Sequence, residues 1–104
     1  VPWNGIYKRE FLMNNQIRFN NLFCVNDRSF YITVCVKGKR MMVTRVPFVK
    51  HRVNVGGSLV GKRAQHFECQ FRSYELMENI CKENSVKENI RFEILEHEMY
   101  DLFV

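Results

Sequence analysis

The chain has 104 residues and a mass of 12.5 kDa, with 46% hydrophobic and 26% charged residues. These fractions are those of ordinary globular proteins, which excludes a disordered or fibrous chain, and the length predicts a single domain, residues 1–104. No apolar run approaches the ~20 residues that a membrane-spanning helix needs, so no membrane partner is expected.

Charge is distributed unevenly along the chain, although the net value is only +5. Residues 1–67 contain twelve Lys and Arg and two acids (+10), whereas residues 68–104 contain four Lys and Arg and nine acids (−5). Such asymmetry indicates a charged partner. The basic part would attract a polyanion, and the acidic part would repel it.

The first half of the chain predicts strands and turns. Residues 17–25 and 41–46 have strand-like patterns, and residues 30–36 are rich in β-branched and aromatic side chains, as in a strand buried on both faces. Residues 26–29 and 37–40 have turn compositions, so a hairpin is expected between 30–36 and 41–46. Pro47 ends that hairpin, and short strands at 53–55 and 59–60 flank a turn at 56–58.

The second half adds a clear alternation at residues 64–72, one helix at 73–81 and another strand at 90–94. The tail after residue 94 fits either a helix or a strand. Six or seven short strands joined by short turns predict an all-β protein: a small antiparallel β-barrel or sandwich with one short helix. The expected core is Phe19, Phe23, Ile32, Val34, Val43, Phe67, Cys69, Phe71, Leu76, Ile80, Phe92 and Ile94.

The cysteines are expected to be reduced. Cys24, Cys35 and Cys69 fall within strand-like runs, where a cysteine usually acts as a small buried hydrophobe, and the fourth is Cys81. The chain also contains no Asn-x-Ser/Thr sequon. Together these features predict an intracellular protein of the cytoplasm or nucleus.

No pattern of metal ligands is evident. The pair His66 and Cys69 would lie on opposite faces of the predicted strand, with Cys81 and His97 further along the chain. The paired ligand spacing of structural zinc sites is missing. We therefore expect no metal and no cofactor.

Catalytic patterns are equally weak. A ribonuclease-like hydrolase would use histidines such as His51, His66 and His97, but no spacing brings them together. Residues 56–62 resemble a phosphate-binding loop, yet Arg63 stands where that loop needs Ser or Thr. A non-enzymatic protein is expected, with a small basic hydrolase as the catalytic alternative.

A cluster of basic residues is the clearest candidate binding feature. It is interleaved with Phe30, Tyr31, Phe48 and Phe67, and basic grooves with aromatic platforms bind single strands in barrel folds. Lysines that protect edge strands from aggregation are the structural alternative. The candidate binding residues are Lys37, Lys39, Arg40, Arg45, Lys50, Arg52, Lys62 and Arg63.

The strand-like runs at 30–36 and 64–72, together with the composition, make the chain resemble the baculovirus telokin-like proteins. The resemblance implies a non-catalytic β-barrel in a virus-infected cell and assigns no site residues. The predicted function is thus a non-enzymatic interaction module, in these terms a viral accessory protein, whose basic β-surface meets an acidic partner. That partner is an acidic protein surface or a nucleic acid, and a barrel that binds single-stranded nucleic acid is the specific alternative.

Overall fold

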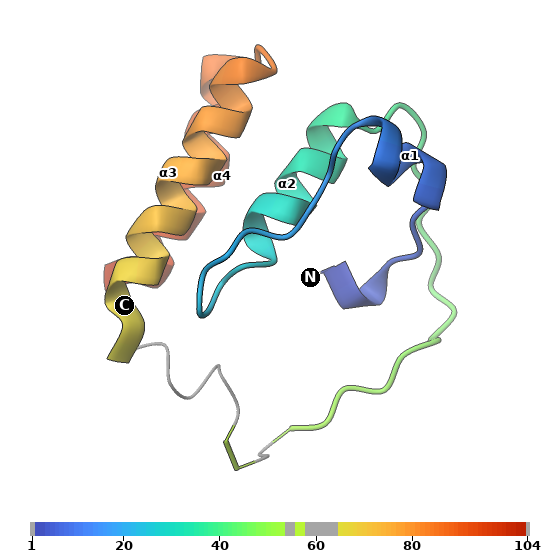
Figure 1. Ribbon diagram of the computed structural model, residues 1–104, viewed down its shortest axis with the longest axis horizontal. Coiled ribbons are helices and arrows are strands. Elements are labelled where there is room, and N and C mark those ends of the chain that lie inside the picture. The colour runs from blue at the N-terminus through green and yellow to red at the C-terminus, as the bar shows by residue number, and fades with distance from the viewer. Residues whose placement is uncertain (1, 54–55, 58–64, 104) are drawn as a thin grey trace.

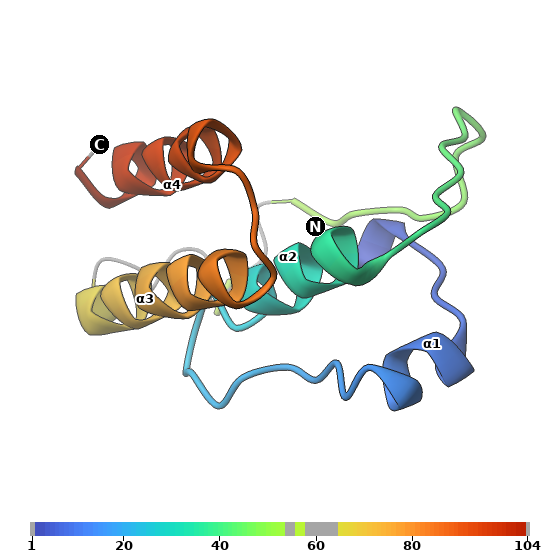
Figure 2. The same ribbon diagram turned by 90° about the horizontal axis from the view of Figure 1, so that it is seen from above.

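The computed structural model describes residues 2–53, 56–57 and 65–103, and these residues form helices and coil without any β-strand (Figure 1). A short 3-10 helix, η1 (Pro2–Asn4), precedes α1 (Arg9–Asn14), α2 (Arg28–Lys37), α3 (Phe67–Glu83) and α4 (Glu88–Phe103). α2 packs on α3, α3 packs on α4, and η1 contacts α2. Viewed from above, α4 and α1 lie on opposite sides of a layer that contains α2 and α3 (Figure 2). The predicted all-β barrel or sandwich is therefore wrong.

α2 is the segment with the strongest β propensity, yet it is helical. Phe30 and Val34, one turn apart, are buried against Ile17 in one core cluster. The hydroxyl of Thr33 donates to the carbonyl of Ser29 at 2.6 Å, so this β-branched residue is satisfied within the helix. Packing of one helical face therefore outweighs the β propensity of these residues, which determines secondary structure only weakly.

α3 includes the predicted helix at 73–81, which is confirmed, but begins six residues earlier. The alternation at 64–72 misled because Phe67 and Phe71, four residues apart, share a face in a strand and in a helix alike. In the structure these two rings are 42% and 45% exposed and contact each other edge to face at 4.9 Å. The residues that α3 buries follow the helical period instead: Cys69, Gln70, Ser73, Met77 and Cys81.

The same ambiguity explains the error at residues 90–94. Ile90 and Ile94 are also four residues apart, and both belong to α4, in which Leu95 is buried. The tail whose structure the sequence left open is helical to the end of α4.

The remaining predicted strands have no partner to pair with. Residues 17–25 form an irregular segment, and residues 41–46 are exposed coil because the proposed hairpin partner, 30–36, is helical. The predictions for 53–55 and 59–60 lie largely outside the described residues, as does residue 64.

α1 and α3 end in the same way. Beyond each helix one residue adopts a left-handed conformation, Gln16 (φ 52°) after α1 and Ser85 (φ 53°) after α3. The next amide then reaches back: Ile17 N–H donates to the Leu12 carbonyl at 2.9 Å, and Val86 N–H donates to the Cys81 carbonyl at 3.0 Å. Both endings are Schellman motifs, in which glycine is the usual left-handed residue.

Two clusters form the core around α2 and α3. One joins Ile17, Phe30 and Val34, and the other joins Cys24, Val25 and Cys69. The hydroxyl of Ser73 on α3 donates to the carbonyl of Val25 at 3.4 Å, which ties the irregular segment to the helix.

The predicted core is correct only in part, because a period of two selects the wrong faces of a helix. Val34 and Cys69 are buried, and Ile32, Leu76, Ile80 and Ile94 are half-buried. The exposed members are Phe19, Phe23, Val43, Phe67, Phe71 and Phe92. Cys24 and Cys69 are buried as predicted, whereas Cys35 is half-buried.

No helix in the described ranges is long and apolar enough to span a bilayer. The resemblance to the telokin-like proteins rested on the runs 30–36 and 64–72. Residues 30–36 belong to α2 and residues 67–72 belong to α3, so the β-barrel that the resemblance implied is not the fold of this protein.

Candidate functional site

The basic residues gather on one extended segment, which we call the basic arm (residues 37–53). Lys37 is the last residue of α2, and residues 38–53 are exposed and form neither helix nor strand. In Figure 1 the arm, in green, leaves the upper end of α2, descends on the side of the molecule opposite α3 and α4, and then runs back across the lower part of the view. The arm contains six Lys and Arg and no acid.

The structure therefore places six of the eight predicted binding residues on one segment: Lys37, Lys39, Arg40, Arg45, Lys50 and Arg52. Lys62 and Arg63 lie outside the described residues. The prediction that these residues lie on a β-surface is wrong, because the arm belongs to no sheet. Of the four interleaved aromatic residues only Phe48 is on the arm, because Phe30, Tyr31 and Phe67 belong to helices and Phe30 is buried.

The ion pairs seen between described side chains do not involve the arm. They join His66 with Glu68, Arg72 with Glu75 and Lys82 with Glu78, at or within α3. In one of them Lys82 Nζ lies 2.8 Å from Glu78 Oε1, and this hydrogen bond holds the pKa of Glu78 below its usual range. Residues 38–53 of the arm are all exposed, so its cations from Lys39 onward lie at the surface.

One contact fixes the far end of the arm on the N-terminal segment. The ring of His51 lies 4.9 Å from that of Trp3, at an interplanar angle of 40°. Apolar side chains of the arm are also open to solvent: Met42 is 90% exposed, Val43 86% and Phe48 51%. The arm therefore offers apolar and aromatic contacts beside its charges.

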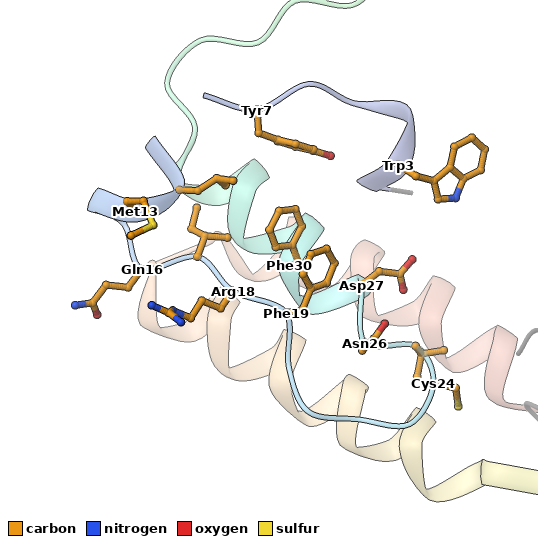
Figure 3. Close-up of a pocket in the computed structure, with 13 residues that line it drawn as sticks. Trp3, Tyr7, Met13, Gln16, Arg18, Phe19, Cys24, Asn26, Asp27 and Phe30 are labelled. Atoms are coloured by element: carbon orange, nitrogen blue, oxygen red, sulfur yellow. The ribbon is translucent and has the colours of Figure 1, made fainter. Parts of the chain in front are cut away.

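Trp3 also lines a cavity of about 990 Å³ between the N-terminal segment, residues 12–27 and the start of α2 (Figure 3). This volume is at the upper end of the ~300–1,000 Å³ that small-molecule sites occupy. The floor is apolar and buried, with Ile17, Val25 and Phe30 among its residues. Sequence reasoning missed the cavity because it needs the fold to bring residues 3–30 around one space.

Four aromatic rings surround the cavity. Phe19 stacks on Phe30 with centroids 4.3 Å apart and planes 4° from parallel, and Tyr7 meets Phe30 edge to face at 5.5 Å. Burial, more than the nearby Tyr31 and Cys35, raises the pKa of Tyr7 above its usual range. Tyr7 and Phe30 thus form an inner wall, while Trp3 and Phe19 are about half exposed, at 48% and 56%.

Polar groups lie at opposite ends of the cavity. In Figure 3 the Asp27 carboxylate lies on the side of Phe30 that faces Trp3, with Asn26 below it near Cys24, and the side chain of Arg18 extends toward Gln16 at the other end. Asp27 precedes α2 but makes no side-chain capping hydrogen bond to it. The cavity therefore has an acidic end and a basic end, separated by aromatic rings.

Weak signals for this site were present in the sequence. Trp3 is the only tryptophan, and Tyr7 follows it by four residues in a segment to which no strand or helix was assigned. Asp27 is one of only two acids in the first 67 residues. Neither observation could reveal that Trp3 and Asp27 line the same cavity.

The three histidines of the predicted catalytic alternative lie on three different segments. His51 is on the arm, His66 stacks on Phe23 at 4.0 Å just before α3, and His97 is on α4. Burial raises the pKa of the Cys81 thiol, which is opposite to the shift that activates a catalytic thiolate. Among the described residues no group of three or more His, Cys, Asp or Glu could hold a metal ion.

Comparison of the chain with protein-family models, curated proteins and solved structures found no match. The arm and the cavity are therefore interpreted from their geometry and chemistry alone.

Proposed function

We propose that the chain is a non-enzymatic binding module whose basic arm binds single-stranded nucleic acid. The observation that carries the proposal is the arrangement of charge: six Lys and Arg, no acid, and an exposed extended backbone over residues 38–53. A row of cations on an extended chain can follow a phosphate backbone, and neutralising each phosphate releases condensed counterions.

Exposed rings favour a single strand over an acidic protein as the partner. Phe48 on the arm and Trp3 beside His51 are both about half exposed. Unpaired bases stack on such rings with ~1–3 kcal/mol each, whereas an acidic protein surface offers few planar groups. The first part of the arm descends on the side of the molecule opposite the acidic helices α3 and α4 (Figure 1), and this also supports the proposal because their carboxylates would repel a polyanion.

The test is binding of the protein to a fluorescent oligouridylate, measured by anisotropy over a range of salt concentrations. If all six cations contact phosphates, log Kd should rise by about 4 per log unit of salt, at ~0.7 for each contact. The triple variant Lys39→Glu, Arg40→Glu, Arg45→Glu should bind at least ~10-fold more weakly at low salt and with a smaller slope. These three residues are exposed and outside any helix, so folding should be unaffected.

A charge-matched control separates the arm from net charge. The variant Lys8→Glu, Arg9→Glu, Lys87→Glu makes the same change in charge at the N-terminal ends of α1 and α4, where acidic side chains are well tolerated. It should keep most of the affinity and the slope of the parent. Equal losses in the two variants would contradict a specific role for the arm. Equal competition by polyglutamate would identify an acidic protein as the partner and would reject the nucleic-acid proposal.

A further inference from the structure

The cavity beside Trp3 has a shape and polarity that suit one part of such a nucleic acid. We infer that it binds a guanine nucleotide, either free or as a residue of a single strand. The inference rests on the proposed function for the choice of ligand class, but it concerns different residues from those of the arm. His51 of the arm contacts Trp3 at the edge of the cavity, so a strand bound to the arm would pass close to the opening.

Two ring faces are available for a planar base. Phe30 is only 5% exposed, and its ring is already covered by Phe19 on one face and by the edge of Tyr7. Trp3 and Phe19 line the same cavity and retain about half of their surface in solvent. A base that stacks on Trp3 or on the outer face of Phe19 would bury apolar surface that the fold leaves open.

The carboxylate at one end selects the base. Asp27 can only accept hydrogen bonds, and guanine presents two adjacent donors, N1–H and the N2 amino group, that match the two oxygens of a carboxylate. Adenine has no N1–H, and uracil has a single donor on its Watson–Crick edge. Asp27 therefore favours guanine over these two bases.

The cation at the other end suits the phosphate. Arg18 lines the same cavity, and its guanidinium can bind phosphate through two parallel hydrogen bonds. In Figure 3 Arg18 lies at the Gln16 end and Asp27 at the Trp3 end, with the rings between them. This order of carboxylate, rings and guanidinium matches the order of base edge, base plane and phosphate in a nucleotide.

The backbone next to the acidic end is strained. Val25 has φ 51°, a left-handed conformation that is unfavourable for a β-branched residue, and it lines the cavity directly before Asn26 and Asp27. The Ser73 hydrogen bond to the Val25 carbonyl holds this turn in place. Strain of this kind is concentrated at ligand sites, where it fixes the direction of a functional group.

Fluorescence of Trp3, the only tryptophan, reports binding directly. The full chain is titrated with GMP, guanosine, AMP and UMP. GMP should give a saturable change and bind at least ~5-fold more tightly than AMP or UMP, as expected for one bidentate pair. GMP should also bind more tightly than guanosine, because only the nucleotide carries the phosphate.

Two variants assign the two ends of the site. Asp27→Asn should reduce the preference for GMP over AMP, because the amide has only one acceptor for the two guanine donors and can itself form a bidentate pair with adenine. Asparagine is as good as aspartate at a helix N-terminus, so α2 should be retained. Arg18→Gln should remove the difference between GMP and guanosine without changing the preference for guanine. Glu10→Gln and Arg9→Gln, on α1 and outside the cavity lining, are the matched controls and should change neither ratio.

The outcomes of the two proposals can be separated. No saturable response to GMP, or equal affinity for GMP and AMP, would overturn the nucleotide site. Salt-dependent binding of oligouridylate would still support the arm in that case, because this oligomer contains no guanine. A guanine-containing oligomer that binds more tightly than GMP would identify the strand as the natural ligand, whereas equal affinity would identify the free nucleotide.

Discussion

The end of α3 offers a sharp test of the helical fold. Ser85 is exposed and adopts φ 53°, the left-handed position of a Schellman motif that ends the helix. This conformation costs an L-amino acid roughly 1–2 kcal/mol relative to glycine. Glycine in turn loses about 0.5–1 kcal/mol more in backbone entropy on folding. Ser85→Gly should therefore stabilise the protein by about 0.5–1 kcal/mol.

The change can be followed by thermal unfolding monitored by circular dichroism. With an unfolding entropy of ~2.1 cal/mol/K per residue, a chain of 104 residues should show a rise in Tm of about 2–5 °C. Ser85→Val is the matched control and should lower Tm, because a β-branched residue is poorly tolerated at positive φ. A fall in Tm for Ser85→Gly, or equal effects of glycine and valine, would refute the assignment of this helix end.

Two further predictions concern the hydroxyl groups of Ser73, Tyr7 and Tyr31. Ser73→Ala removes the hydrogen bond to the Val25 carbonyl from a side chain that is 1% exposed, and should cost about 0.5–1.5 kcal/mol in urea unfolding. A neutral result would mean that this bond does not hold the turn. The pKa values of Tyr7, mainly through burial, and of Tyr31, mainly through Cys35, are raised above the ordinary value of about 10. The unfolded chain therefore releases these protons first, and stability should fall as pH rises above about 10. The tyrosine absorbance of the folded protein should therefore rise at a higher pH than that of the unfolded chain, and coincident titration curves would contradict this.

The helix at 73–81 could be predicted because the spacing of its apolar residues fits the period of a helix and not the period of a strand. The adjacent apolar pairs 76–77 and 80–81 recur one helical turn apart, and a strand with one buried face cannot place two adjacent side chains on that face. The segments 67–71 and 90–94 could not be assigned in the same way, because pairs such as Phe67 and Phe71 satisfy both periods. Only the packing of α3 against α2 and α4 decides between them.

The ends of α1 and α3 could not be predicted from the sequence for a different reason. Glycine just after a helix is the strongest stop signal in a sequence, and Gln16 and Ser85 occupy that position after α1 and α3. The proposed strand at 30–36 was favoured for its β-branched residues, although Gly38 directly after α2 is a helix-ending signal. The β propensity of residues 30–36 and the missing glycines after α1 and α3 thus disfavour the observed helices locally, and tertiary packing stabilises the helices despite them.

The basic arm was found from composition because its charges need no fold to be recognised, and the cavity was missed because it exists only in the fold. The two sites meet where His51 contacts Trp3. The arm is the most open part of the described chain, since residues 38–53 are all exposed and include seven large apolar side chains. The proposed binding of a polyanion would use both features of this segment, its exposed apolar side chains and its six cations.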